Sequence, residues 1–273
     1  MKYSADFKQI ALDALKSKWL IATLTHFVAS LLGGTVITTS TNIVSSNIDS
    51  DSLPAIISSI ESEETSAIIL LFMIVASLIV LLYCIAIFII SGPVRLGYAQ
   101  FNLNLIDKNT PRFTDLFSKF KHFGSGFCMN FLTGLYISLW SLLFIIPGII
   151  KTYSYAMTPY ILAENPELTA NEAITKSRQI MNGNKWRLFC LHFSFIGWHF
   201  LLALPIILIV LFGLLLMAIS EVLGAFAFIV LSLLYLAFLF VGTLAINTYQ
   251  EAANAAFYRE VSYVPVYVPR ELD

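Results

Sequence analysis

Residues 67–90 read AIILLFMIVASLIVLLYCIAIFII, an unbroken apolar run without one charged side chain. The hydrocarbon core of a bilayer is about 30 Å thick, and a helix needs roughly 20 apolar residues to cross it. This run is long enough, so it predicts a membrane-spanning helix. Gly92 and Pro93 follow it. We expect them to disturb the helix where it leaves the bilayer, because proline lacks the backbone donor that a helix uses.

The composition extends this prediction to the whole chain. Of the 273 residues, 58% are hydrophobic and 12% are charged, and the mean hydropathy is +0.80. A soluble domain carries about 25% charged residues, so this chain has too little charge to cover a surface in water. The net charge of −1 indicates no basic surface for a nucleic acid, and we expect no nucleic-acid partner.

The apolar sequence divides into six predicted spans within one integral membrane domain, residues 1–273. The spans are expected at about 19–43, 67–91, 125–146, 149–164, 188–217 and 222–247. Amphipathic helices at the cytoplasmic interface are expected at about 3–18, 110–123 and 169–182. The predicted fold is therefore all-α, a polytopic membrane helix bundle with cytoplasmic interfacial helices and with both termini in the cytoplasm.

Residues 125–164 allow two interpretations. One long span would place residues 165–187 outside the cell, although their Lys and Arg side chains are typical of a cytoplasmic loop. Two spans joined by a tight turn at Pro147 and Gly148 avoid this, because both residue types interrupt helices. We favour two spans, of which the second (149–164) is short enough to be a re-entrant segment instead. A further break is expected at Pro205, as a kink in the fifth span.

The distribution of charge favours six spans over five. With six spans, Lys151 is the only one of the sixteen Lys and Arg residues that lies outside. Cytoplasmic loops collect Lys and Arg in this way. Of the seventeen acidic residues, those outside would be Asp49, Asp51, Glu61, Glu63, Glu64 and Glu221.

The segment 165–187 has clear local signals for a cytoplasmic helix. Thr169 and Glu172 have the spacing of a capping box, in which each side chain bonds the other residue's backbone N–H. Gly183 lies where the end of a helix favours a left-handed residue. Basic residues at this surface are expected to meet anionic lipid headgroups. They are Lys176, Arg178, Lys185 and Arg187.

No combination of residues predicts catalysis. The chain has none of the motifs of P-loop ATPases, dinucleotide-binding folds, zinc proteases or serine hydrolases. Its three cysteines are far apart and lack CxxC or Cys/His spacing, so neither a disulfide framework nor a zinc site is predicted. We expect no enzyme activity, no cofactor and no bound metal.

Three further residues are candidates for a functional or structural role. His199 shares a helix face with His192, and interhelical hydrogen bonds are the structural alternative to a functional role. Lys151 follows the predicted turn, and it either reaches the outer interface or is buried with a partner such as Glu221. Glu164 is expected to cap the preceding span or to pair with a Lys or Arg of the following helix.

The run from Leu139 to Trp198 carries a resemblance to a known family. It contains LWSLLFIIPGIIK (139–151), YSYAM (153–157), YILAENP (160–166), MNGNKWRLF (181–189) and SFIGW (194–198). This run resembles the bacterial integral membrane family known as domain of unknown function 975, and the rest of the chain looks similar too. The chain is also distantly similar to the membrane domain that accompanies some glycerophosphodiester phosphodiesterases, which is not their catalytic domain. The family has no established activity, so the resemblance implies a bacterial membrane protein and no particular reaction.

Together these observations favour a non-enzymatic protein of the bacterial cytoplasmic membrane. Its cytoplasmic segments would engage membrane lipids, another membrane protein or both, in envelope maintenance, stress response or peptide resistance. Two alternatives stay open: a small permease or lipid-handling transporter that uses kinked spans, and a membrane-embedded lipid-modifying enzyme. No motif indicates a ligand or an oligomeric state. The candidate positions are Pro147, Gly148, Lys151, Glu164, Lys176, Arg178, Lys185, Arg187 and His199.

Overall fold

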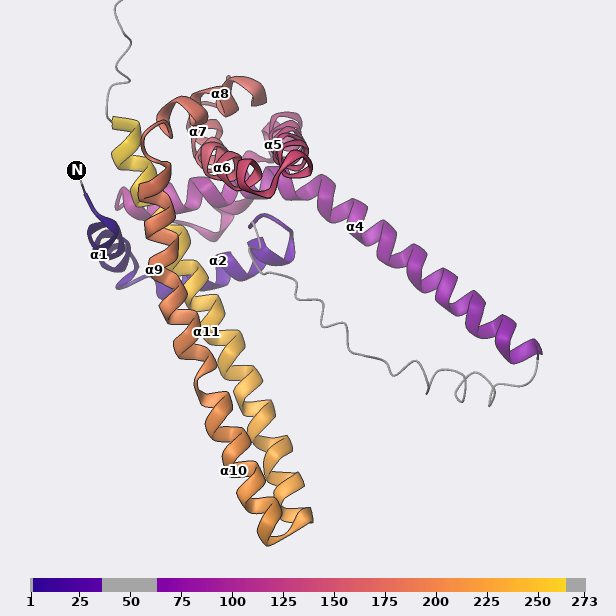
Figure 1. The fold of residues 1–273 in the computed structure, drawn as a ribbon. Coiled ribbons are helices and arrows are strands. Elements are labelled where there is room, and N and C mark those ends of the chain that lie inside the picture. Colours follow the sequence, from indigo (N-terminus) through magenta and orange to yellow (C-terminus); the bar gives the residue numbers. More distant parts are fainter. Residues whose placement is uncertain (1, 36–62, 264–273) are drawn as a thin grey trace, which may run out of the picture.

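The computed structural model describes residues 2–35 and 63–263, which form helices joined by short connections, with no strand among them (Figure 1). The all-α prediction is confirmed for these residues. The helices are α1 (Ser4–Leu15), α2 (Trp19–Leu31), α4 (Glu63–Ile106), the 3-10 helix η1 (Phe113–His122), α5 (Phe123–Leu143), α6 (Ile145–Tyr155), α7 (Thr158–Glu164), α8 (Ala170–Ile180), α9 (Lys185–Ala203), α10 (Pro205–Ile219) and α11 (Glu221–Tyr263).

Long apolar helices dominate the described part of the chain. Four stretches are long and apolar enough to cross a membrane: Ile69–Ile106, Phe113–Leu143, Lys185–Ala218 and Gly224–Tyr263. They present large apolar side chains to the surroundings, and Phe72, for example, is 71% exposed. In water each exposed apolar Å² costs about 25 cal/mol, a cost that lipid removes. The protein is therefore built for a membrane.

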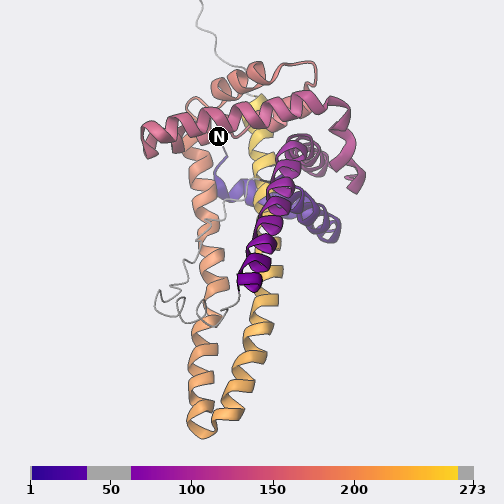
Figure 2. The same cartoon turned by 90° about the vertical axis from the view of Figure 1, so that its right-hand side faces the viewer.

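The helices extend from a common base, which we define as α1, residues 94–106 of α4, α7 and residues 249–263 of α11. In Figure 1 the first part of α4 leaves this base in one direction, and α9, α10 and α11 leave it in another. Figure 2 shows the hairpin of α9, α10 and α11 extending away from the remaining helices. The apolar lengths of α4, α9, α10 and α11 thus lie on the extensions, and the base stands at one end of the molecule.

The base contains the hydrophobic core. Phe7 of α1, Phe101 of α4 and Phe257 of α11 are each at most 1% exposed. The rings of Phe7 and Phe257 meet edge to face, with 5.2 Å between their centroids. The apolar face of α1 therefore packs against protein. The predicted interfacial helix 3–18 exists as α1, but its location on a lipid surface is not confirmed, and the same holds for the predicted helices at 110–123 and 169–182.

Glycines allow α4 to approach its neighbours closely. A Cβ atom at Gly92 would overlap the carbonyl oxygen of Gly126 in α5, and one at Gly97 would overlap that of Leu116 in η1. Small residues have this role at helix contacts in membrane proteins. The helix continues through Pro93 to Ile106. Gly92 and Pro93 therefore mark a helix crossing, where the sequence had suggested a disturbance of the helix.

The prediction of six spans is not confirmed. In the predicted span 19–43 the described helix, α2, has 13 residues, a length of about 20 Å, and residues 36–43 lie outside the described ranges. The predicted span 149–164 is divided between α6 and α7. Residues 158–163 of α7 are all buried, so this part belongs to the base.

The connection between α5 and α6 also differs from the prediction. The break lies at Phe144, which is extended with φ −158° and ψ 144°, and α6 begins at Ile145. The predicted tight turn at Pro147 and Gly148 is therefore wrong. Pro147 lies in the first turn of α6, where a missing backbone N–H removes no helical hydrogen bond.

Two local predictions are confirmed. The capping box at the start of α8 is present, with Thr169 N donating to Glu172 Oε2 at 2.8 Å and Glu172 N donating to Thr169 Oγ1 at 3.3 Å. The break at Pro205 is also present, because α9 ends at Ala203 and α10 begins at Pro205.

Candidate functional site

The residues predicted around the α5–α6 connection form a close helix contact. A Cβ atom at Gly148 would overlap the hydroxyl of Ser141, so glycine is needed for the two helices to meet. The ammonium of Lys151 lies 4.5 Å from the centre of the Trp140 ring across this contact. Lys151 is half-buried and interacts with an aromatic face of the neighbouring helix.

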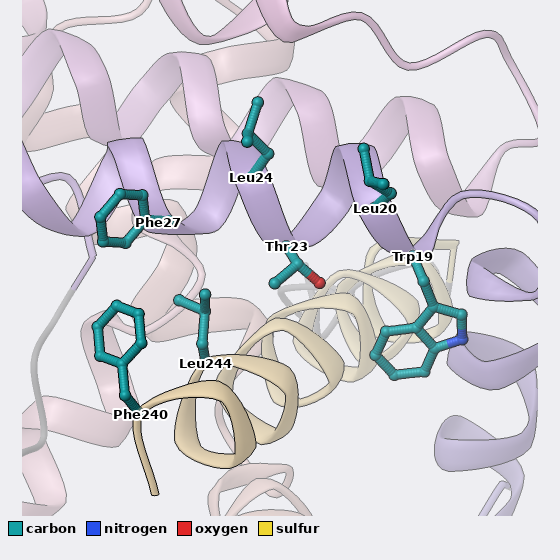
Figure 3. A pocket seen from close by; sticks show the side chains of 7 residues that line it. All are labelled: Trp19, Leu20, Thr23, Leu24, Phe27, Phe240 and Leu244. Carbon is teal, nitrogen blue, oxygen red and sulfur yellow. The ribbon is translucent and has the colours of Figure 1, made fainter. Parts of the chain in front are cut away.

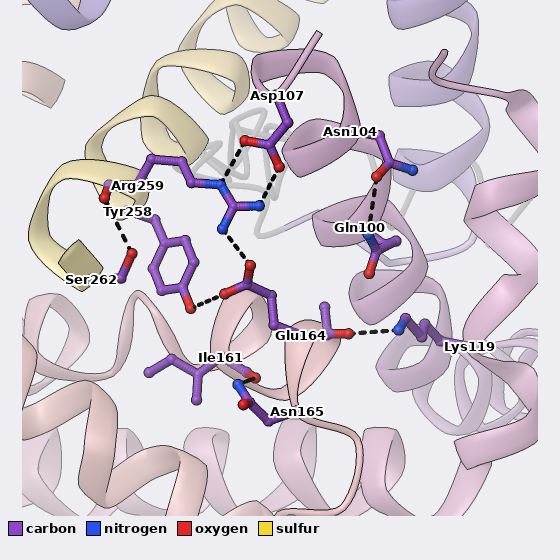
Figure 4. A network of polar contacts seen from close by, with 11 residues as sticks. Gln100, Asn104, Asp107, Lys119, Ile161, Glu164, Asn165, Tyr258, Arg259 and Ser262 are labelled. Carbon is purple, nitrogen blue, oxygen red and sulfur yellow. Dashed lines mark hydrogen bonds and ion pairs between the residues drawn. The ribbon is translucent and has the colours of Figure 1, made fainter. Parts of the chain in front are cut away.

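Glu164 belongs to an ion-pair network that joins α4, α7 and α11 (Figure 4). Arg259 of α11 is ion-paired with both Glu164 and Asp107, and its Nε donates to Asp107 Oδ1 at 2.8 Å. The Tyr258 hydroxyl donates to Glu164 Oε2 at 2.6 Å. The sequence had suggested a partner on the helix that follows Glu164, and the partner lies on α11 instead.

Arg187 has a structural position as well. Its guanidinium donates to Glu260 Oε1 at 2.5 Å and to the carbonyl oxygen of Lys2 at 2.8 Å. It also lies 5.8 Å from the centre of the Phe7 ring and 5.6 Å from that of Phe257. Arg187 therefore connects α1, α9 and α11, and its charge is already neutralised by a carboxylate.

The other three predicted basic residues of this region face outward. Lys176 and Arg178 are exposed on α8, and Lys185 is half-buried at the start of α9. Within residues 2–35 and 63–263, none of the three takes part in an ion pair. Trp186, which follows Lys185, is 70% exposed. Lys185 and the exposed indole of Trp186 thus lie next to each other at the start of α9.

The two histidines of α9 have different surroundings. The Nδ1 atom of His199 lies 3.1 Å from the carbonyl oxygen of Phe195 in the preceding turn, and the residue is exposed. His192 is half-buried, and its Nε2 lies 2.9 Å from Asn254 Oδ1 of α11. His192 therefore makes the interhelical hydrogen bond that the sequence had suggested for this pair, and His199 makes a local one.

A partly buried polar chain continues from Asn254 through the base. Glu251 lies three residues before Asn254 on α11, and its charge interacts with that of Arg95 of α4 without an ion-pair contact between these two described residues. The Tyr160 hydroxyl of α7 donates to Glu251 Oε2 at 3.3 Å, and Arg95 Nη1 donates to Asn130 Oδ1 of α5 at 3.4 Å. These contacts join α4, α5, α7 and α11 where the apolar extensions enter the base.

Sequence reasoning missed Arg95 and Glu251, although a signal was present. Arg95 is the only charged residue between 67 and 106, and Glu251 is the only one between 222 and 258. Ionisable residues in apolar helices are usually paired with one another. A lone cation and a lone anion in two long apolar runs are therefore candidates for an electrostatic interaction. Across the described ranges no group of three His, Cys, Asp or Glu side chains is placed to hold a metal ion.

Comparison with known proteins identifies a family and nothing more specific. The family model described as "Protein of unknown function (DUF975)" matches residues 142–264, which run from the end of α5 through α11. No curated protein matches the chain, and no solved structure matches it. The expected similarity to the membrane domain of glycerophosphodiester phosphodiesterases is not shown. Over residues 142–264, the chain is therefore similar to the DUF975 family of proteins of unknown function.

Proposed function

We propose that this chain is a non-enzymatic protein of the bacterial cytoplasmic membrane that binds anionic lipid headgroups through Lys176, Arg178 and Lys185, which we call the basic collar. The observation that carries the proposal is the contrast with Arg187 and Arg259. Those two arginines are paired with carboxylates, whereas within the described ranges the collar cations are in no ion pair.

The position of the collar suits a lipid surface. Lys185 and Trp186 begin the apolar stretch Lys185–Ala218, and tryptophan and basic residues are typical of the level at which a helix enters the headgroup region. Each Lys or Arg near an anionic membrane contributes about 1 kcal/mol to the attraction.

A six-span topology with both termini in the cytoplasm accompanies this proposal. Its support is the charge asymmetry of the sequence, in which Lys151 alone of the sixteen Lys and Arg would lie outside. The collar then faces the cytoplasmic leaflet. A membrane-protein partner at the same surface is the competing occupant, and it is an outcome of the following test.

The test uses purified protein in which Trp186 is the sole tryptophan. In a first titration it is reconstituted in phosphatidylcholine bilayers with increasing fractions of brominated phosphatidylglycerol. In a second titration the bilayers are phosphatidylglycerol, and increasing fractions of brominated phosphatidylcholine are added. Bromine quenches the indole, so the two titrations give the preference for the anionic lipid beside the collar. Replacing Lys176, Arg178 and Lys185 by glutamine should lower this preference by about fivefold per residue.

The matched control is Lys121→Gln on η1, an exposed lysine outside the collar, which should leave the Trp186 preference unchanged. An equal preference for phosphatidylglycerol in the collar variant and the unaltered protein would overturn the proposal. It would leave a protein partner, or no binding role, for this surface.

A small permease is the second candidate, and the partly buried polar chain favours it. Arg95 and Glu251 interact electrostatically at the junction of the apolar extensions and the base. Paired ionisable residues in apolar helices often mark the path of a solute or an ion. Solute or ion flux into proteoliposomes that Arg95→Gln abolishes would support a permease, and absence of flux for both proteins would exclude it for the solutes tried.

A further inference from the structure

A groove with one polar hydroxyl in its lining lies between α2 and α11. Its volume is about 500 Å³, within the roughly 300–1,000 Å³ of small-molecule sites. Figure 3 shows Thr23 and Trp19 of α2 pointing toward α11, whereas Leu20 and Leu24 point away from it. The lining residues are Trp19, Leu20, Thr23, Leu24 and Phe27 of α2, and Phe240 and Leu244 of α11.

The two ends of the groove differ. At one end Phe27 and Phe240 meet edge to face, with 5.8 Å between their ring centroids. At the other end lies Trp19 (Figure 3), the first residue of α2. The indole N–H makes tryptophan suited to the boundary between an apolar region and water, so a long apolar ligand would have its polar end here.

The Trp19 end is also the basic end. Lys18 donates from Nζ to the carbonyl oxygen of Asn109 at 3.0 Å, which places it beside the loop that carries Lys108. Lys16 is ion-paired with Asp13 at 2.7 Å, and Asp13 also interacts electrostatically with Lys108. Two lysines, Lys16 and Lys108, thus interact with Asp13, and Lys18 lies beside the loop of Lys108, which leaves positive charge where the chain enters α2.

We infer that this groove binds one acyl chain of an anionic phospholipid, with the phosphate against Lys16, Lys18 and Lys108. The inference rests on the proposed function, for which it names the lipid class and a second binding position. An apolar groove alone accepts any hydrocarbon. The aromatic end and the basic end together match an amphiphile with a negative headgroup.

The experiment uses the full chain with Trp19 as the sole tryptophan, in bilayers that contain dibrominated-acyl phosphatidylglycerol or phosphatidylcholine. Quenching of Trp19 should show a preference for phosphatidylglycerol. Replacing Lys16, Lys18 and Lys108 by glutamine should lower that preference about fivefold per lysine. Asp13→Asn should act in the opposite direction and raise it, because it removes the carboxylate that is ion-paired with Lys16.

Two further variants test the geometry. Thr23→Phe fills the groove between its ends and should reduce the preference for phosphatidylglycerol while all three lysines remain. Lys121→Gln is the charge control and should change nothing. Each variant is first shown to unfold at the same temperature as the parent. A weaker preference for phosphatidylglycerol is then not caused by loss of the folded structure.

Equal quenching by the two headgroups, or a preference that neither the lysine replacements nor Asp13→Asn alters, would overturn the inference. The collar is measured separately through Trp186. If Trp186 shows a preference for phosphatidylglycerol and Trp19 shows none, the proposed function is supported and lipid binding in the groove is excluded. If Trp19 shows the preference for phosphatidylglycerol and Trp186 shows none, lipid binding by the basic collar is excluded and the groove is the lipid site.

Discussion

Replacing Arg259 by methionine should lower the free energy of unfolding by about 2–4 kcal/mol. Arg259 is 18% exposed and pairs with Asp107 and Glu164, whose side chains are 32% and 31% exposed. Removing one partner of a fully buried ion pair costs about 3–5 kcal/mol, because a charge stays buried without compensation. A hydrogen bond to a charged group contributes about 1.5–3 kcal/mol. The partial exposure of both carboxylates moves the expectation toward the lower figures.

The assay is unfolding of the purified protein in mixed micelles with increasing dodecyl sulfate, followed by tryptophan fluorescence. Lys176→Met also replaces a cation by methionine, but at an exposed position. Its free energy of unfolding should stay within about 0.5 kcal/mol of that of the parent. Adding Asp107→Asn and Glu164→Gln to the Arg259→Met protein should restore part of the loss, since neutral amides leave no unpaired charge. A loss for Arg259→Met no larger than that for Lys176→Met would refute the reasoning.

Three further predictions concern the α5–α6 contact, the start of α8 and the topology. Lys151→Met should cost about 0.5–1 kcal/mol, the contribution of a cation over an aromatic ring, and in a double-mutant cycle this cost should disappear in the Trp140→Leu background. Hydrogen bonds from the backbone and hydroxyl of the capping threonine hold the pKa of Glu172 below its ordinary value. The cap therefore stabilises α8 above a pH of about 4.3 and weakens as the pH falls through the lower folded-state pKa; amide exchange in α8 should accelerate there, and Glu172→Gln should remove that pH dependence. Single cysteines should be labelled by a membrane-impermeant reagent on intact cells at Glu221 but not at Gln179, and labelling at Gln179 would contradict the six-span topology.

Local and compositional features could be predicted from the sequence. The apolar run at 67–90 indicates a membrane helix because length and hydrophobicity alone decide whether a segment can cross a bilayer. The capping box of Thr169 and Glu172 was predictable because its hydrogen bonds join residues three apart. The break at Pro205 was predictable for the same reason, since proline acts on its own turn of helix.

The sequence by itself determined that this is a helical membrane protein that resembles the DUF975 family over residues 142–264, with a basic surface near residues 165–187. Only the tertiary structure decided which cations remain unpaired there. Arg187 and Lys185 look alike in sequence, yet Arg187 is bonded to Glu260, 73 residues away. Glu164 is bonded to Arg259, 95 residues away. Partners at such separations are set by how α1, α4, α7, α9 and α11 pack, because ion pairing needs contact in space and no pattern along one helix records it.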